Sequence, residues 1–198
     1  MSFEIITKLE VKIAEFFNAP YAVAVDCCTH GIELCLRYQN LSYISVPKRT
    51  YISVPFLANK LKINLKWRDE EWQDYYKVNE HFKPIYDAAV LWKKNSYIPG
   101  SFMCLSFQFQ KHLSLGRGGM ILCDNKNDYI DIPWRNQNID TIGYHYYMTP
   151  ETAQNGLDKL DDAIKTIPRQ WTVNDWPDVS NMEVFNKQKG LDPYLQTR

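Results

Sequence analysis

The chain has 198 residues, which suits one domain, or one domain with a tail, and is long enough to bury a sizeable core. Its 23 Lys and Arg residues equal its 23 Asp and Glu residues, so no excess positive charge is available to neutralise phosphates, and non-specific nucleic-acid binding is disfavoured. Hydrophobic residues make up 45% of the chain, but no stretch approaches the length of a membrane span. We therefore expect neither a nucleic acid nor a membrane among its partners.

The amino terminus and the cysteines indicate a soluble, cytoplasmic protein. Residues 1–17 form an amphipathic segment that contains acidic residues, unlike a signal peptide. The five cysteines are odd in number and lie mostly in apolar segments, which favours buried reduced thiols over disulfides. Their spacing with the four histidines gives no four-ligand zinc pattern, so we expect no metal site.

The first part of the chain alternates helices and short strands. In chain order the apolar spacing predicts a helix over 1–17 with Ser2 as its cap, a strand over 21–25 and a helix over 32–38. The corner Cys28-Thr29-His30 joins the strand to the second helix. Such a corner directs free backbone amides at whatever lies there. The alternative interpretation is an ordinary helix cap by Thr29.

The middle of the chain contains a carboxylate, Asp87, that we expect to be buried. Its predicted elements are a strand over 43–46, a helix that ends at Leu61, and strands over 62–65 and 84–88. The segment 66–83 is charged and aromatic without a clear period, so we expect it at the surface. Asp87 lies near the end of the last of these strands. A carboxylate on a buried strand needs a partner, because an unpaired buried charge is costly.

Lys111 lies between two apolar strands, which we predict over 102–107 and 119–123. The three glycines at 116, 118 and 119 mark a turn where the backbone folds tightly or is approached closely. A lysine held between buried strands is expensive to keep charged, so its pKa falls and its amine becomes a usable nucleophile. The alternative is a solvated loop lysine in a β-hairpin.

The remaining elements complete the predicted organisation. We expect a turn into a helix over 124–131, and a helix after Thr149-Pro150 with an apolar face. Residues 1–167 would form the main domain, and 168–198 a polar tail that docks its aromatic residues on it. Strands that alternate with helices predict an α/β fold, with a mostly parallel sheet, helices on both faces and a site at the strand ends.

Three motifs occur in an order that resembles a known family. They are D-A-A at 87–89, S-F-x-x-x-K at 106–111 followed by G-x-G-G at 116–119, and G-Y-x-Y-x-M at 143–148. This arrangement resembles the DegT/DnrJ/EryC1/StrS family of pyridoxal-phosphate (PLP) sugar aminotransferases, over roughly residues 14–165. The resemblance implies the large domain of fold-type I PLP-dependent aminotransferases.

The resemblance also implies roles for individual residues. Lys111 would carry PLP covalently, Asp87 would face the ring nitrogen, and Tyr51 would stack on the ring. Cys28, Thr29 and His30 of the corner would hold the cofactor phosphate, together with Ser106 at the start of the lysine segment. In a homodimer, His145 would reach the phosphate site of the partner subunit.

The chain departs from the family pattern at several places. Cysteine and histidine stand at 28 and 30 where the family has glycine and alanine, and Val90 follows D-A-A where a polar residue is common. His145 stands where asparagine is usual, and Tyr147 replaces an arginine. We also expect the family's C-terminal domain to be missing, which leaves the acceptor-binding wall unexplained.

The first functional hypothesis is an aminotransferase that moves an amino group from an amino acid, with glutamate as the favoured donor, to a nucleotide-linked keto sugar. The second is a shortened, non-catalytic homologue that acts as a PLP-binding, sugar-nucleotide-binding or assembly module. A third is a sugar dehydratase. Some family members of that kind carry histidine in place of the lysine, so Lys111 counts against it.

Overall fold

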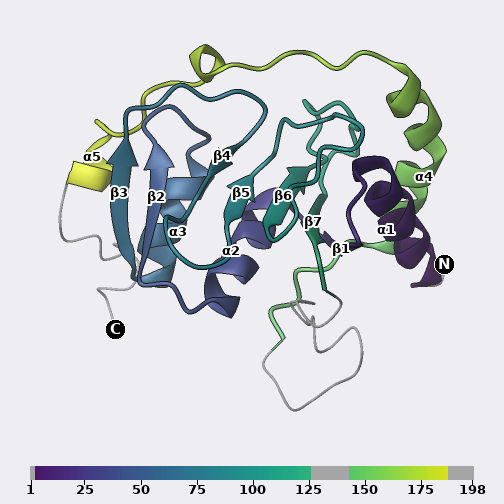
Figure 1. Cartoon of the computed structure of the whole chain (residues 1–198), viewed down its shortest axis with the longest axis horizontal. Helices are drawn as coiled ribbons and strands as arrows, with labels where there is room; N and C mark the ends of the chain where they lie inside the picture. Colours follow the sequence, from purple (N-terminus) through teal and green to yellow (C-terminus); the bar gives the residue numbers. More distant parts are fainter. Residues whose placement is uncertain (1–2, 126–142, 187–198) are drawn as a thin grey trace.

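The computed structural model describes residues 3–125 and 143–186. Within these residues the elements are α1 (Glu4–Phe17), β1 (Tyr21–Val25), α2 (Cys28–Tyr38), β2 (Tyr43–Pro47), α3 (Ser53–Leu61), β3 (Asn64–Arg68), β4 (Tyr76–Lys77), β5 (Ile85–Asp87), β6 (Phe102–Ser106), β7 (Gly119–Cys123), α4 (Pro150–Lys165), the short 3-10 helix η2 (Val173–Asp175) and α5 (Glu183–Asn186). Figure 1 shows their arrangement.

A five-stranded sheet in the order β1-β7-β6-β5-β4 forms the centre of the described structure. Strands β1, β5 and β6 run in one direction, because β5 pairs parallel with β6 and both β1 and β6 pair antiparallel with β7. The short β4 also runs against β5. Strands β2 and β3 form a separate parallel pair, and the Ser45 N–H donates to the Val78 carbonyl oxygen just beyond β4.

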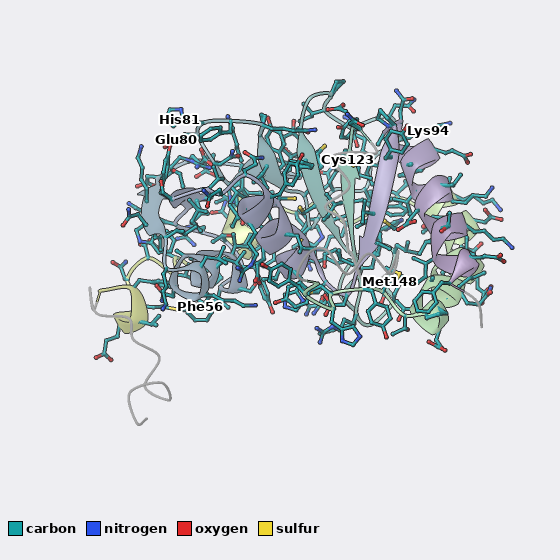
Figure 2. All side chains as sticks on the ribbon, turned by 90° about the horizontal axis from the view of Figure 1, so that it is seen from below. Phe56, Glu80, His81, Lys94, Cys123 and Met148 are labelled. Carbon is teal, nitrogen blue, oxygen red and sulfur yellow. The ribbon has the colours of Figure 1, made fainter. Side chains whose placement is uncertain are left out.

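Both faces of the sheet are covered, because successive strand residues point to opposite sides. On β1, Ala22 and Ala24 join a hydrophobic cluster with α1 and α4, whereas Val23 and Val25 join a second cluster with α2 and α3. Strands β6 and β7 alternate in the same way. Met148 is buried in the first cluster, at the approach to α4 (Figure 2). The α/β fold with helices on both faces is thus confirmed.

Several predicted boundaries shift for local reasons. Helix α2 begins at Cys28, four residues before the predicted start at 32, and its N-cap Cys27 makes no side-chain capping bond. Helix α3 ends in a left-handed Lys62 with φ of 56°, which delays the next strand to Asn64. Ser2 and the predicted helix over 124–131 fall mainly outside the described residues.

The sequence predicts that the segment 66–83 lies at the surface, but part of it is buried. Tyr76 on β4 and the adjacent Val78 are buried, because β4 pairs with the interior strand β5. The cysteines agree with expectation: all five are free, and all except Cys27 are buried. Among the described residues, no helix combines the length and apolar character that a membrane crossing requires.

Residues 166–186 leave α4 and run back across the molecule (Figure 1). Two isolated bridges attach this segment to distant loops, one between Thr172 and Gln73 and one between Asp178 and Arg49. The Val179 N–H donates to the Lys48 carbonyl oxygen at 2.9 Å. The segment therefore spans from the α4 side of the sheet to the β2 side.

Candidate functional site

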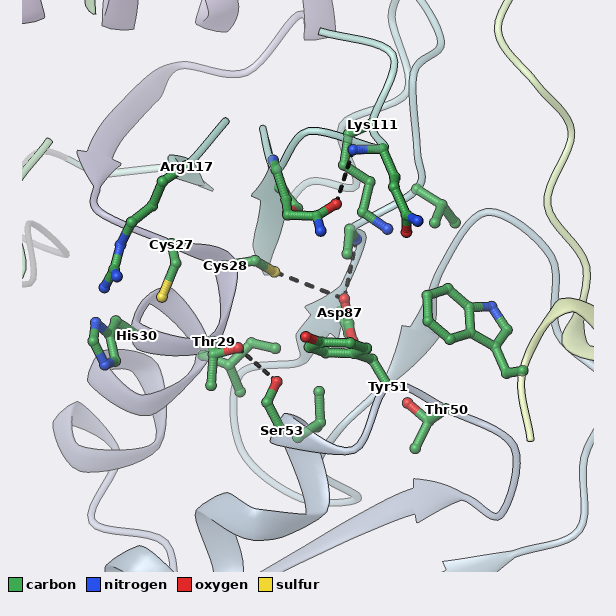
Figure 3. A pocket seen from close by; sticks show the side chains of 18 of the residues that line it. Cys27, Cys28, Thr29, His30, Thr50, Tyr51, Ser53, Asp87, Lys111 and Arg117 are labelled. Atoms are coloured by element: carbon green, nitrogen blue, oxygen red, sulfur yellow. Dashed lines mark hydrogen bonds between the residues drawn. The ribbon is translucent and has the colours of Figure 1, made fainter. Parts of the chain in front are cut away.

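A cavity of about 440 Å³ opens where the carboxyl ends of β1, β2, β5 and β6 meet. It is lined by most of the residues that the resemblance implies for the site: Cys28, Thr29, His30, Tyr51, Asp87, Ser106 and Lys111. Figure 3 shows Lys111 above Asp87 among the side chains that line this cavity. An edge that collects the carboxyl ends of several strands is the usual position of a ligand site in an open α/β sheet.

Lys111 lies in the loop that joins the antiparallel strands β6 and β7, so it belongs to a hairpin, but it is not fully solvated. Its backbone N–H donates to the Gln108 carbonyl oxygen at 2.8 Å. Its Nζ lies 4.9 Å from the ring centre of Trp171 and 5.2 Å from that of Trp176. Burial lowers the pKa of Lys111. The structure thus supports the expected direction of this shift.

Asp87 closes β5 and is only 5% exposed. One carboxylate oxygen accepts a hydrogen bond from the Tyr76 hydroxyl at 2.6 Å, and the other accepts from the Ala89 N–H at 3.0 Å. The Cys28 thiol approaches the same oxygen at 3.8 Å and donates to the Cys104 carbonyl oxygen at 3.2 Å. Burial raises the pKa of Asp87. These donors are neutral, so the carboxyl still lacks a charged hydrogen-bond partner among the described residues.

Tyr76 is a site residue that the sequence does not reveal. It lines the cavity, and its hydroxyl also contacts the Thr50 hydroxyl. Its side chain reaches the site because β4 places it directly opposite Asp87 in the strand register. A two-residue strand inside a charged segment leaves no periodic signal, so only the pairing of β4 with β5 identifies this tyrosine.

The amino termini of α2 and α3 meet at one wall of the cavity. The Thr29 hydroxyl lies 2.7 Å from that of Ser53, the first residue of α3. Thr29 is therefore in the first turn of α2 and bonds across to another helix, so the alternative of an ordinary N-cap is wrong. Two helix amino termini direct backbone N–H groups and positive dipole ends toward this wall, which suits an anion.

Gly119 allows this wall to form. A Cβ atom at position 119 would lie 2.6 Å from the Cys27 carbonyl carbon and 2.6 Å from the Cys28 nitrogen. The start of α2 therefore packs directly on the backbone of β7. Of the glycines after Lys111, Gly119 serves this close approach, which is one of the two roles that the sequence predicts for them.

His30, the last residue of the corner, and Arg117 bring positive charge to this part of the cavity. Both contact the Asp26 carboxylate at 2.7 Å, one at each oxygen. The hydrogen bond to Asp26 raises the pKa of His30 to about 9, with further support from Cys27. The His30 ring also stacks on Tyr146 at 3.7 Å. His30 is therefore positively charged at neutral pH.

Asp26, Cys27 and His30 also bring three potential metal-ligand atoms within 4.8 Å of one another. Both oxygens of Asp26 are already engaged by His30 and Arg117. The geometry is that of a charge cluster at the rim of the cavity.

His145 does not line the cavity of its own chain. It is exposed, with a left-handed φ of 60°, and its ring lies 4.9 Å from that of Tyr147. The neighbouring Tyr146 carbonyl oxygen accepts from the Asp26 N–H at 3.0 Å, which holds this segment beside the start of α2. The expected role of His145 in a partner subunit stays a prediction.

Trp176 is the second site residue that the sequence does not identify by role. It lines the cavity from the segment after α4. Its ring packs edge-on to Tyr51 at 6.0 Å and near Trp72 at 6.2 Å. The described part of the predicted tail thus docks its aromatic residues on the body at the site itself, while the division of the chain at residue 167 stays a prediction.

Comparison with known proteins gives matches only at the level of structure. No family profile and no curated protein matches the chain. A putative sugar aminotransferase, Spr1654 from Streptococcus pneumoniae in its apo form, aligns with a TM-score of 0.64 and 15% identity, over 79% of this chain and 58% of that one. DesI, determined in the presence of its TDP-sugar product, aligns with a TM-score of 0.67 and 15% identity, over 83% and 54%.

A putative PLP-dependent aminotransferase from Bacillus cereus gives a TM-score of 0.63 and 18% identity, over 81% of this chain and 60% of that one. The chain thus spans little more than half the length of these structures. At such identities the likeness concerns the fold. The strand order, the helices on both faces and these matches together show that the chain has the fold of the PLP-dependent sugar aminotransferases of the DegT/DnrJ/EryC1/StrS type.

Proposed function

We propose that the protein is a PLP-dependent aminotransferase that moves an amino group from an amino acid, with glutamate as donor, to a nucleotide-linked keto sugar. The observation that carries this proposal is the presence of Lys111 and Asp87 on one cavity with opposite pKa shifts. An amine whose pKa is lowered is a better nucleophile, and a buried carboxyl suits a cationic partner. The sugar-aminotransferase fold supports the same reaction class.

The residues of the cavity fit the cofactor. Asp87 lacks a charged hydrogen-bond partner among the described residues, and a protonated pyridine nitrogen would supply one. The joined amino termini of α2 and α3 would hold the phosphate, with Ser106 nearby on the cavity wall. When bound, PLP supplies an electron sink for the carbanion formed at the donor's α-carbon.

The chain's own residues would then perform the proton transfers. The Lys111 amine would act as the base that removes the proton from the donor's α-carbon, because burial lowers its pKa toward the working pH. A cation that faces Asp87 would favour its ionised form and so oppose the effect of burial, which raises its pKa. Tyr76 fixes the orientation of the Asp87 carboxylate through its 2.6 Å hydrogen bond.

The test is the visible absorbance of the purified protein with added PLP. We expect a band from lysine-bound cofactor that Lys111→Ala abolishes and that Lys94→Ala, an exposed control, retains. The wild type should also exchange label between glutamate and 2-oxoglutarate. An unchanged spectrum in Lys111→Ala would refute the assignment of this lysine.

A second candidate is a non-catalytic homologue that keeps PLP or sugar-nucleotide binding. Val90 favours it, because Val90 lines the cavity close to Asp87 and its side chain offers no hydrogen bond to a bound ring. In that case the absorbance band would form, but glutamate and 2-oxoglutarate would exchange no label.

A further inference from the structure

The segment 166–179, which we call the strap, runs beside the cavity and contributes Trp176 to its lining. Its start follows α4, and η2 is closed by reciprocal bonds between Thr172 and Asp175. Its far end is held at Lys48 and Arg49, where the Val179 N–H donates to the Lys48 carbonyl oxygen at 2.9 Å. Because both ends are attached to the body, the strap holds Trp176 against the cavity in a fixed position.

The strap supplies an apolar wall. Trp176 lines the cavity together with Tyr51 and Trp72, whose rings lie 6.0 and 6.2 Å from it. The Trp72 indole N–H donates to the Arg49 carbonyl oxygen at 2.9 Å, which fixes that ring against the loop after β2. Large rigid aromatic faces of this kind bind flat apolar surfaces with little loss of side-chain entropy. A glutamate side chain, which is charged, gains little from such a wall.

The wall stands at a defined distance from the reacting amine. The Lys111 Nζ lies 5.2 Å from the ring centre of Trp176. A ring packed on the indole at about 3.5–4 Å, the usual carbon–carbon contact distance, would have its carbons beside that amine. The C–H face of a hexose is flat and apolar enough to make this contact, and its keto carbon must come close to Lys111 for the amino group to be transferred.

A cation marks the outer side of the same wall. The exposed Arg49 donates from Nη1 to the Trp176 carbonyl oxygen at 3.0 Å. A sugar packed on Trp176 would extend its diphosphate outward past this guanidinium, which binds phosphates well. The wall and the cation therefore match the two parts of a nucleotide sugar.

We propose that Trp176 binds the sugar ring of the nucleotide-sugar substrate and so forms the acceptor wall of this chain. This inference rests on the proposed function, because the position of the keto carbon is argued from Lys111. Trp176 contacts the sugar directly. Trp72 packs beside the Trp176 ring, and Arg49 holds the Trp176 backbone in place.

The test compares ligands with and without the sugar. Calorimetric titrations of the full chain with dTDP-glucose and with dTDP give the affinity that the sugar adds. We expect Trp176→Ala to weaken dTDP-glucose about tenfold, equivalent to about 1.4 kcal/mol, while the affinity for dTDP changes less than about twofold. Trp176→Phe should lie between wild type and Trp176→Ala. Trp67→Phe, whose ring packs on Phe185 away from the cavity, should match the wild type.

A variant-free measurement covers the case in which Trp176→Ala does not fold. Saturation-transfer NMR on the wild type should show the strongest transfer at the ring protons of the glucose. Equal loss of dTDP and dTDP-glucose in the variants, equal affinity of the two ligands in the wild type, or transfer confined to the base would overturn the proposal. If glutamate exchange fails while the Trp176-dependent sugar affinity persists, the transamination is refuted and the sugar wall stands.

Discussion

At the scale of single residues, burial acts in opposite senses on the two groups that matter most. It lowers the pKa of Lys111 and raises that of Asp87, because both charged forms lose solvation. Each group opposes the effect on the other, since an amine and a carboxylate on one cavity attract. Groups arranged in this way are characteristic of functional sites, and they are held here by β5 and by the β6–β7 loop.

Tyr76→Phe tests the support of Asp87. The variant removes the hydroxyl that donates to the buried carboxylate at 2.6 Å, so we expect the free energy of unfolding to fall by about 1–3 kcal/mol in urea titrations. It should also weaken PLP binding, because Asp87 loses its orientation. The control is Tyr97→Phe, which removes a buried hydroxyl bonded to the Ser101 carbonyl oxygen at 2.9 Å, away from the cavity. PLP affinity equal in both variants would argue against the role of Tyr76.

His30 makes stability depend on pH. The hydrogen bond to Asp26 raises its pKa in the folded state to about 9, from 6.5. A folded-state pKa above the unfolded value stabilises the fold fully below about pH 6.5, and this contribution is lost as pH rises through about 9. After allowance for solvent screening at this half-buried site, we expect a loss of about 1 kcal/mol. Thermal unfolding at pH 6 and at pH 9.5 measures this loss of stability. His30→Ala should reduce the difference in stability between the two pH values, whereas the control His81→Ala, at an exposed histidine, should leave it unchanged.

At the scale of elements, regular apolar periodicity predicts well, and irregular starts do not. The strand over 21–25 and the strand over 119–123 appear as predicted, because each is a continuous apolar run that is buried apart from Tyr21. Helix α2 starts four residues before its predicted start, because no capping residue in the sequence marks its true beginning. The sequence does not predict Tyr76 as a site residue, because its two-residue strand forms only by pairing with β5. It does not predict Trp176, because bridges to distant loops set the position of the strap. Most implied site residues reach one cavity because they follow strand ends.

Gly119→Ala tests how β7 positions the start of α2. The new Cβ would lie 2.6 Å from backbone atoms of Cys27 and Cys28, so α2 must move away from the sheet. We expect a loss of about 1–3 kcal/mol of stability, as for other overpacked sites, and weaker PLP binding. Gly100→Ala is the control: its φ of 78° strains an alanine, but nothing lies within 4 Å of the added atom. Calorimetric PLP titration should separate the two variants, and unaltered PLP binding in Gly119→Ala would contradict the role of the α2 amino terminus in holding the cofactor.

At the scale of the whole molecule, the chain completes its own cavity with the strap but leaves His145 outside it. His145 belongs to a surface group with Phe3 and Tyr147, in which Phe3 is 47% exposed and its ring lies 5.9 Å from that of Tyr147. Exposed aromatic groups of this kind favour association between copies of a chain. We therefore propose a homodimer in which His145 reaches the phosphate corner of the partner subunit.

Mixing two inactive variants tests this shared site. Lys111→Ala and His145→Ala each damage every site of their own homodimer. In a mixed dimer one site combines the intact Lys111 of one subunit with the intact His145 of the other, while the second site carries both changes. Random exchange of subunits should therefore restore about a quarter of the wild-type transamination rate. Light scattering gives the mass of the assembly. A monomer, or a mixture no more active than its parts, would place His145 outside the site, because a side chain that serves its own subunit cannot be replaced from another.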